Sequence, residues 1–242
     1  MILHDWQADY GHCRTLGREQ WAWEFLRRNP DYQADYQRFI AIWRALEADY
    51  GAPPARDFLR WKADPRAYGP LPGESDGAPD GATGELCTGD DERVFIECWL
   101  GAKWGFHKFP PDPRLDTPGR EALSFRPPPP APPREAQDPY RLDFTFDLSL
   151  PLAPQLDSAR LRLASRVAEL RRAGLAAPRA VATECAHWQT LLRVLDADAA
   201  GVPTAQRIAA GLIEDEGHGA RLRAQALAMT RAGYRDILRL AD

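Results

Sequence analysis

The chain has 242 residues, of which 44% are hydrophobic and 27% are charged, and its formal net charge is −4. This composition supports one large or two small folded domains and excludes wholesale disorder. The longest apolar runs fall far short of the roughly 20 residues that span a bilayer, and no secretory signal pattern is present, so we expect a cytoplasmic protein without a membrane span.

Two helices dense in aromatic residues are predicted near the N-terminus. The first begins at about Arg18 and ends at Asn29-Pro30, because the residue before a proline is pushed out of the helical region. The second follows Asp31, carries a broad apolar stripe and ends at Gly51. We interpret the aromatic residues of this region as core, namely Trp21, Trp23, Phe25, Tyr32, Tyr36, Phe39 and Trp43.

The middle of the chain predicts loops and a small β element. Residues 69–90 have the composition of a flexible loop, and residues 127–133 form a polyproline spacer. Two runs, Arg93–Leu100 and Leu142–Leu150, are predicted to be strands, the second because its apolar residues alternate. An antiparallel pairing of the two runs is compatible with their lengths.

Helices are predicted through the C-terminal part. One is capped by Asp157 or Ser158 and ends at Gly174. The next covers about residues 182–197, where four apolar residues share one face at helical spacing. These four residues are Trp188, Leu191, Leu192 and Leu195.

Three closely spaced helices then suggest a helix-turn-helix. A short helix capped by Thr204 is followed by a longer one from about His218 to Arg231, which Gly233 ends. Small residues in the short helix (Ala205, Ala209, Ala210) would let it pack closely on the longer one. In this motif the last helix enters the major groove of DNA. The candidate DNA-contacting residues are Arg207, His218, Arg221, Arg223 and Gln225.

The same spacing is also common in plain helical bundles. The segment EDEG, residues 214–217, places three carboxylates just before the proposed reading helix. These carboxylates would repel phosphate, and they would also stabilise the positive N-terminal end of the helix.

Charge is distributed unevenly along the chain. Residues 160–242 contain 13 arginines and nine carboxylates, whereas residues 1–159 contain 18 basic and 26 acidic residues. A basic C-terminal part can localise phosphate binding, and it can equally be the ordinary charge of solvated helices.

We find no pattern that indicates an enzyme, a cofactor or a metal site. The sequence has no glycine-rich phosphate loop, no G-x-S-x-G and no H-E-x-x-H motif. The N-terminal His4, Asp5, His12 and Cys13 match no zinc spacing. The four cysteines form no C-x-x-C pair, and we expect them to be reduced.

Several segments, in order, resemble a proteobacterial family of small regulators from integrative and conjugative elements. They are WAWEFLRRNPDYQADY (21–36), KWGFHKFPPDP (103–113), FDLSLPLAPQLDSAR (146–160), WQTLLRVLDADAAGVPTAQRIAAGL (188–212) and GYRDILRL (233–240). The family includes the FseA-type activators of element excision and the QseM-type antiactivators that bind them. It combines an N-terminal transcriptional-regulator domain with a C-terminal divergent helix-turn-helix domain.

The predicted fold is mainly α with a small β element. It comprises an N-terminal regulator-like module (1–115), a Pro-rich linker (116–140) and a C-terminal helix-turn-helix-like domain (141–242). With the resemblance, this predicts a DNA-binding transcriptional regulator, an activator associated with a mobile genetic element. Its expected partners are promoter or operator DNA and, as proteins, RNA polymerase or an antiactivator. The alternative is an antiactivator that binds proteins without contacting DNA.

Overall fold

The computed structural model describes residues 5–8, 10–74, 86–89, 92–107, 109–119, 122–128, 140, 142–175, 180–240 and 242. The chain divides into two compact units, the first made of residues 1–129 with 180–242 and the second of residues 130–179. Much of the predicted loop (75–85) and most of the polyproline spacer (129–133) lie outside the described residues.

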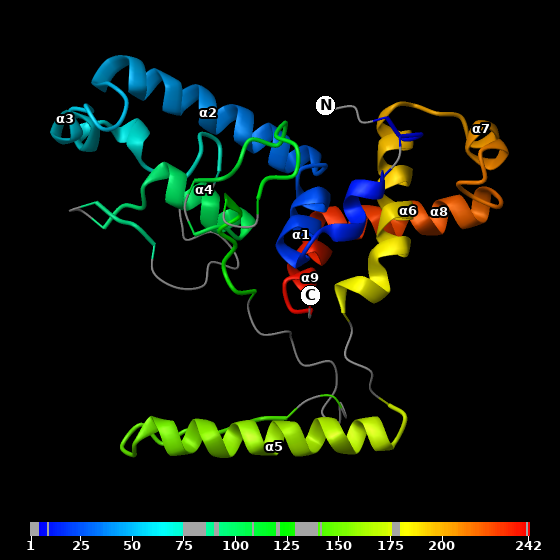
Figure 1. Cartoon of the computed structure of the whole chain (residues 1–242). Helices are drawn as coiled ribbons and strands as arrows, with labels where there is room; N and C mark the ends of the chain where they lie inside the picture. Colours follow the sequence, from blue (N-terminus) through cyan, green and yellow to red (C-terminus); the bar gives the residue numbers. More distant parts are fainter. Residues whose placement is uncertain are drawn as a thin grey trace. The chain divides into compact units, whose positions relative to one another are not determined.

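The first unit is a helical assembly built from both ends of the chain (Figure 1). Its helices are α1 (Arg18–Leu26), α2 (Pro30–Tyr50), α3 (Phe58–Ala63), α4 (Ile96–Trp104), α6 (Val181–Ala199), α7 (Thr204–Ala209), α8 (Glu216–Ala228) and α9 (Tyr234–Ile237). The 3-10 turns η1 (Tyr10–Thr15) and η2 (Pro65–Ala67) and a π-helical turn η4 (Met229–Gly233) complete it. The second unit contains α5 (Leu152–Arg172). The predicted, mainly helical fold class is therefore confirmed, and no helix of the described residues is long and apolar enough to cross a membrane.

Local chemistry fixes the boundary between α1 and α2, as the sequence predicts. The Asn29 side-chain oxygen accepts hydrogen bonds from the backbone N–H groups of Asp31 (2.8 Å) and Tyr32 (3.3 Å). Pro30 occupies the first helical position, where its missing N–H has no helical partner to lose. Gly51 ends α2 with a φ of +84°, a conformation that glycine adopts without steric cost.

The strand predicted at Arg93–Leu100 is wrong. Val94 and Phe95 form only isolated antiparallel bridges before the chain enters α4 at Ile96. Seven of the nine residues of α4 are buried, so its apolar run shows no polar face and no helical period. The sequence pattern of such a short apolar run does not distinguish a buried helix from a buried strand.

The strand predicted at Leu142–Leu150 is also wrong. Among the described residues this segment pairs with no strand, and it lies instead beside α5. The Phe144 ring stands 5.4 Å from the Arg162 guanidinium, and the Asp147 backbone N–H donates to Gln155 Oε1 at 2.9 Å. An extended chain that leans on a helix presents alternate residues to it, which produces the strand-like alternation without a sheet.

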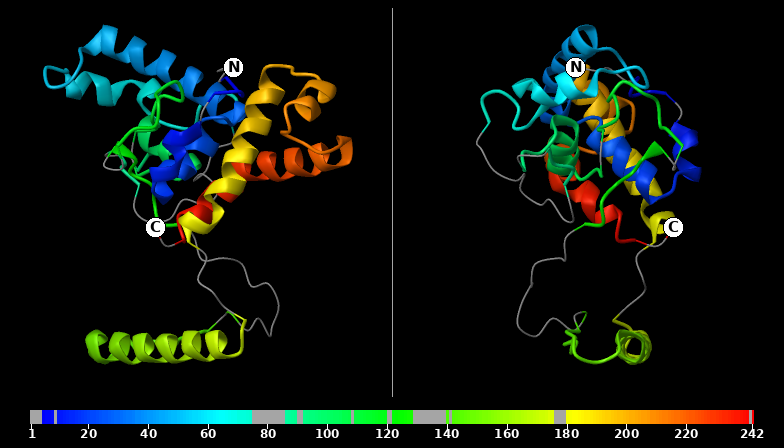
Figure 2. Two further views of the ribbon diagram at one scale, coloured as in Figure 1. Left: turned by 45° about the vertical axis from the view of Figure 1, so that its right-hand side comes forward. Right: turned by 90° about the vertical axis from the view of Figure 1, so that its left-hand side faces the viewer.

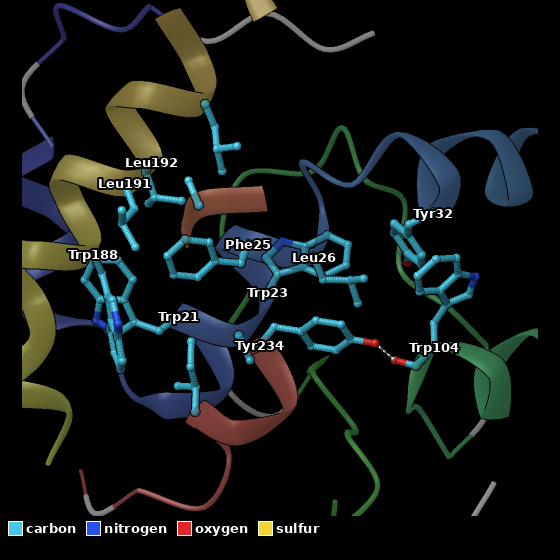
Figure 3. Packing of buried hydrophobic residues seen from close by; sticks show 14 of the residues in the cluster. Trp21, Trp23, Phe25, Leu26, Tyr32, Trp104, Trp188, Leu191, Leu192 and Tyr234 are labelled. Carbon is cyan, nitrogen blue, oxygen red and sulfur yellow. Dashed lines mark hydrogen bonds between the residues drawn. The ribbon is translucent and has the colours of Figure 1, made fainter. Parts of the chain in front are cut away.

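Helix α1 is the centre of the first unit's core (Figure 3). Every side chain from Trp21 to Leu26 is buried. The Trp21 ring meets Trp188 of α6 with centroids 5.1 Å apart, and Trp23 meets Tyr32 of α2 at 5.9 Å. The core role predicted for the aromatic residues is confirmed, although Trp43 is only partly buried.

This core does not follow the predicted domain boundaries. Helices α6, α8 and α9 share it with α1, and the Tyr234 O–H of α9 donates to the Trp104 carbonyl of α4 at 3.0 Å. The segment predicted as one C-terminal domain, 141–242, is divided between the two compact units. The physical reason is α1 itself, because its consecutive buried residues from Trp21 to Leu26 face all sides of the helix and have to be covered on all sides.

All four cysteines carry free thiols, as expected. Cys13 and Cys98 are buried. Burial raises the pKa of each of these two thiols to about 12, aided by Glu24 for Cys13 and by Cys87 and Glu97 for Cys98. They therefore behave as small apolar side chains, because only the thiolate is a strong nucleophile.

A buried network of charges joins α1 to α6 and η1. The Glu24 carboxylate is fully buried and accepts from Arg27 Nε at 3.0 Å and from Arg28 Nη1 at 2.5 Å. The Arg28 guanidinium then makes a bidentate pair with Asp196 of α6, with distances of 2.8 and 2.9 Å. The Tyr10 O–H donates to the same Asp196 carboxylate.

These contacts fix the protonation of the network. Burial by itself raises the pKa of Glu24, but Arg28, Arg27 and a hydrogen bond from the Thr117 hydroxyl together lower it to about 2. Burial raises the pKa of Tyr10, and the neighbouring Asp196 raises it further. At neutral pH Glu24 is therefore ionised and Tyr10 is protonated.

We predict that Glu24→Gln lowers the free energy of unfolding at pH 7 by roughly 3 kcal/mol, because it leaves the buried Arg27 guanidinium without its carboxylate partner, while Arg28 keeps only Asp196. The folded-state pKa of about 2 lies below the ordinary 4.5. The stabilisation is therefore complete above pH 4.5 and is lost as the pH falls towards 2. Urea unfolding measured across this pH range tests both statements.

The matched control is Asp236→Asn, which removes a mostly exposed carboxylate that pairs with Arg239. It should cost less than about 1 kcal/mol. An equal loss of unfolding free energy in the two variants would contradict the role assigned to the buried network. So would a Glu24→Gln variant whose stability falls between pH 4.5 and 2 as steeply as that of the unchanged protein.

Candidate nucleic-acid interface

Helix α6 is the platform of the predicted helix-turn-helix. The four residues predicted to share a face, Trp188, Leu191, Leu192 and Leu195, are all buried, which confirms that face. Helix α8 crosses α6 and packs on it, and α7 lies in the connection between the two (Figure 1). The tri-helical segment is therefore anchored through α6 to the aromatic core around α1.

The apolar contacts that hold helix α7 are made by its flanks and not by its own residues. Its N-cap is Pro203 and not Thr204, and none of its six residues is buried. The residues that anchor it lie outside it: Val202 before, and Leu212 and Ile213 after, are buried.

The expected close packing through alanines is wrong. Ala205, Ala209 and Ala210 of α7 and its end are all exposed. The small residue that permits close packing is Gly219 of α8, where an added Cβ would come within 2.8 Å of Ile213 Cδ1. The connection after α7 thus folds onto the first turns of α8.

Helix α8 begins two residues earlier than predicted. The Asp215 carboxylate accepts from the His218 backbone N–H at 2.6 Å and caps the helix that starts at Glu216. The predicted end at Gly233 is wrong as well, because the chain continues through the η4 turn into α9 with helical backbone angles.

Two of the five candidate residues converge on one carboxylate. Arg207 donates from Nη1 to Asp198 Oδ1 at 2.5 Å and from Nε to the Val202 carbonyl at 2.8 Å. Arg223 of α8 donates to the other oxygen of Asp198. The Arg207 side chain is only 15% exposed, whereas that of Arg223 is 57% exposed. Asp198 therefore ties the end of α6 to both α7 and α8.

The other three candidates share a different flank of α8. His218, Arg221 and Gln225 stand at i, i+3 and i+7, which places them within one strip of a helix with 3.6 residues per turn. Arg223 stands about 200° around the helix from Arg221, because each residue turns by about 100°. The five predicted residues thus form two groups and not one face.

Between the two groups, the outward surface of α8 is made of small residues. Gly217, Ala220 and Ala224 are exposed there, on the side of the helix away from buried Leu222 and Ala226. Side chains this small let another surface approach the helix backbone closely.

The electrostatics of this region are nearly balanced. Residues 180–242 contain seven arginines and eight carboxylates, so the basic excess of the C-terminal part lies in residues 160–179, with six arginines and one glutamate. Glu214 and Glu216 are exposed beside the start of α8, while Asp215 serves as its cap. Among the described residues, no three His, Cys, Asp or Glu side chains are placed to hold a metal ion.

Asp198 was not among the predicted residues, and its sequence carries no signal for this role. It stands in LDADAA in the last turn of α6, and its two arginine partners follow nine and 25 positions later. Only the fold brings the three side chains together.

We predict that Asp198→Asn lowers the free energy of unfolding by roughly 2 kcal/mol, because it leaves the nearly buried Arg207 guanidinium without its charged acceptor. Arg223→Ala removes only the exposed half of the arrangement and should cost less than about 1 kcal/mol. Urea unfolding of both variants makes the comparison. A loss in Arg223→Ala as large as that in Asp198→Asn would show that Arg207 is not the group that depends on Asp198.

Residues 5–61 match the family model of a proteobacterial transcriptional regulator-like domain. The match runs from before η1 to the middle of α3 and includes α1 and α2. Comparison with curated proteins and with solved structures gave no match. The chain therefore carries a transcriptional regulator-like domain at its N-terminal end, and the C-terminal helices are assigned from their geometry alone.

Proposed function

We propose that the chain is a DNA-binding transcriptional regulator in which α8 enters the major groove. The observation that supports this most is the surface of α8, where His218, Arg221 and Gln225 form one polar strip beside an exposed strip of small residues. The major groove is wide enough for one α-helix, and a smooth outward face allows close entry. The regulator-like domain at 5–61 supports a role in transcription.

In this proposal the five candidate residues have two different roles. Arg221 reads guanine through two parallel hydrogen bonds, Gln225 reads adenine, and His218 contacts base or phosphate near the start of the helix. Arg207 and Arg223 act as positioning residues, since both are held by Asp198. The exposed part of Arg223 also lies free to approach a phosphate on the other rim of the groove.

The finer parts of the proposal rest on the resemblance given by the sequence. We infer an activator associated with a mobile genetic element, acting in the cytoplasm at the nucleoid on promoter or operator DNA. The N-terminal domain would then contact RNA polymerase or an antiactivator protein.

The proposal predicts a specific loss in Arg221→Ala. Selection from random-sequence duplexes with the full chain yields the preferred site, and fluorescence anisotropy then gives the dissociation constants. Arg221→Ala should weaken binding to that site by about 5- to 150-fold and relax the preference at one base pair. Affinity should also fall as salt concentration rises.

Arg44→Ala is the matched control, because Arg44 is exposed on α2, outside the C-terminal helices. It should leave binding unchanged. If selection enriches no sequence, or if binding ignores both Arg221→Ala and salt, α8 is not a DNA-reading helix.

The second candidate is an antiactivator-type regulator that binds a protein and not DNA. The specific observation in its favour is the charge around α8, where exposed Glu214 and Glu216 precede the helix and residues 180–242 have no basic excess. For this candidate, Glu214→Gln combined with Glu216→Gln should weaken capture of a regulator protein and create no DNA binding. For a DNA reader, the same variant should strengthen DNA binding, because it removes two repelling charges.

A further inference from the structure

Helix α5 of the second unit is amphipathic and largely uncovered. Of its 21 residues only Ala159 and Leu170 are buried. The unit also holds ten of the large hydrophobic residues that are exposed in the described chain, from Tyr140 to Leu175. Exposed apolar residues in this density mark an interaction surface and not a solvated helix.

The apolar residues of α5 form one narrow stripe. They follow one another at steps of three or four along the helix and are Leu152, Leu156, Ala159, Leu163, Val167 and Leu170. This spacing keeps them within about 80° of the helix circumference. The four that are exposed retain 38–53% of their surface. We call this set the leucine stripe.

One flank of α5 is already occupied by the chain that precedes it (Figure 2). This segment runs antiparallel to the helix, because Tyr140 O–H donates to the Leu175 carbonyl at 2.7 Å while Gln155 Nε2 donates to the Asp147 carbonyl at 2.9 Å. Even with this cover Leu152, Leu156, Leu163 and Val167 of the leucine stripe remain exposed.

Both rims of the leucine stripe are basic. Arg160 and Arg171 stand on one side of it, and Arg162 and Arg166 on the other, at the angles set by 3.6 residues per turn. The helix carries five arginines against two carboxylates. One of these carboxylates, Glu169, is already paired with Arg166 at 3.0 Å.

These features select one kind of occupant. A second copy of α5 would bring arginine rims against arginine rims, which is destabilising in either orientation. A membrane surface favours a helix whose apolar face itself carries aromatic anchors, and the leucine stripe of α5 has none. A narrow leucine seam with charged rims is the pattern of a helix that pairs with another helix.

We propose that the leucine stripe is a docking surface for an amphipathic helix of a partner protein, one with an apolar centre and acidic rims. Leucine-type residues of the partner pack into the stripe, and its glutamates or aspartates pair with Arg160 and Arg171, on the rim that the preceding segment leaves open. Charge complementarity sets the choice of partner, since the apolar centres alone would accept many helices. This surface belongs to the second unit, and the proposal does not depend on DNA binding by α8.

Designed peptides test the proposal with the full chain. The first is a fluorescent helical peptide of about four heptads with leucine at the seam and glutamate at the rims, and the second has lysine in place of each glutamate. We expect the glutamate peptide to bind at least about tenfold more tightly in anisotropy titrations. Equal binding of both peptides, or no binding of the glutamate peptide, overturns the proposal.

Variants locate the binding on the helix. Leu156→Ser with Leu163→Ser should weaken binding of the glutamate peptide by at least about tenfold. Leu161→Ser is the matched control, because Leu161 is 71% exposed on the opposite face of α5, and it should have no effect. All three residues are exposed, so circular dichroism should show unchanged folding. A loss in Leu161→Ser equal to that in the stripe variant rejects the stripe as the site.

Charge-reversal variants measure the contribution of the arginine rims to peptide binding separately from that of the apolar residues. Arg160→Glu with Arg171→Glu should transfer preference from the glutamate peptide to the lysine peptide, whereas Arg172→Glu, on the far face, should not. Two further readouts cover the other occupants. If the full chain self-associates and Leu156→Ser with Leu163→Ser abolishes this, the occupant is a second copy of the chain and the proposal is wrong. If the chain binds phosphatidylserine vesicles tightly and the glutamate peptide only weakly, the occupant is a membrane and the proposal is wrong.

Discussion

The first unit depends on a single buried helix that carries a charge. Helix α1 has no exposed face, and Glu24 lies in its middle with no access to water. A carboxylate can remain ionised in such a place only if cations compensate it, and Arg27 and Arg28 do so from the turn that follows the helix. Arg28 then reaches Asp196 on α6, so the same compensation that keeps α1 buried also connects the two ends of the chain.

The parts of the fold that the sequence predicts well are those decided by local chemistry. Asn29 and Pro30 fix a helix boundary by capping and by a missing N–H, and both effects act within three residues. The face of α6 follows from spacing alone. The segment at 93–100 escaped prediction because α4 is buried on nearly all sides, and a residue run without a polar face has no period to detect.

The candidate site divides in the same way. That His218, Arg221 and Gln225 share a strip of α8 follows from helical geometry. That Arg207 and Arg223 meet on Asp198 depends on how α6, α7 and α8 pack, and no local pattern encodes it. The summed charge of the C-terminal part was also misleading, since its basic excess belongs to α5 and not to the helices around α8. Any specificity of α8 for DNA would therefore come from a few individual side chains and not from a broad positive field.

The discontinuous make-up of the first unit has a consequence for synthesis in the cell. Trp21 leaves the ribosome early, but its cover, Trp188 of α6 and the α9 helix that contains Tyr234, comes more than 160 residues later. At about 5–20 residues per second, roughly 10 to 40 seconds separate Trp21 from Tyr234. During that interval the tryptophans of α1 lack the cover that they have in the finished fold, whereas the second unit is made of one continuous segment and needs no distant part of the chain. The first helix to be made is thus among the last to reach its native environment.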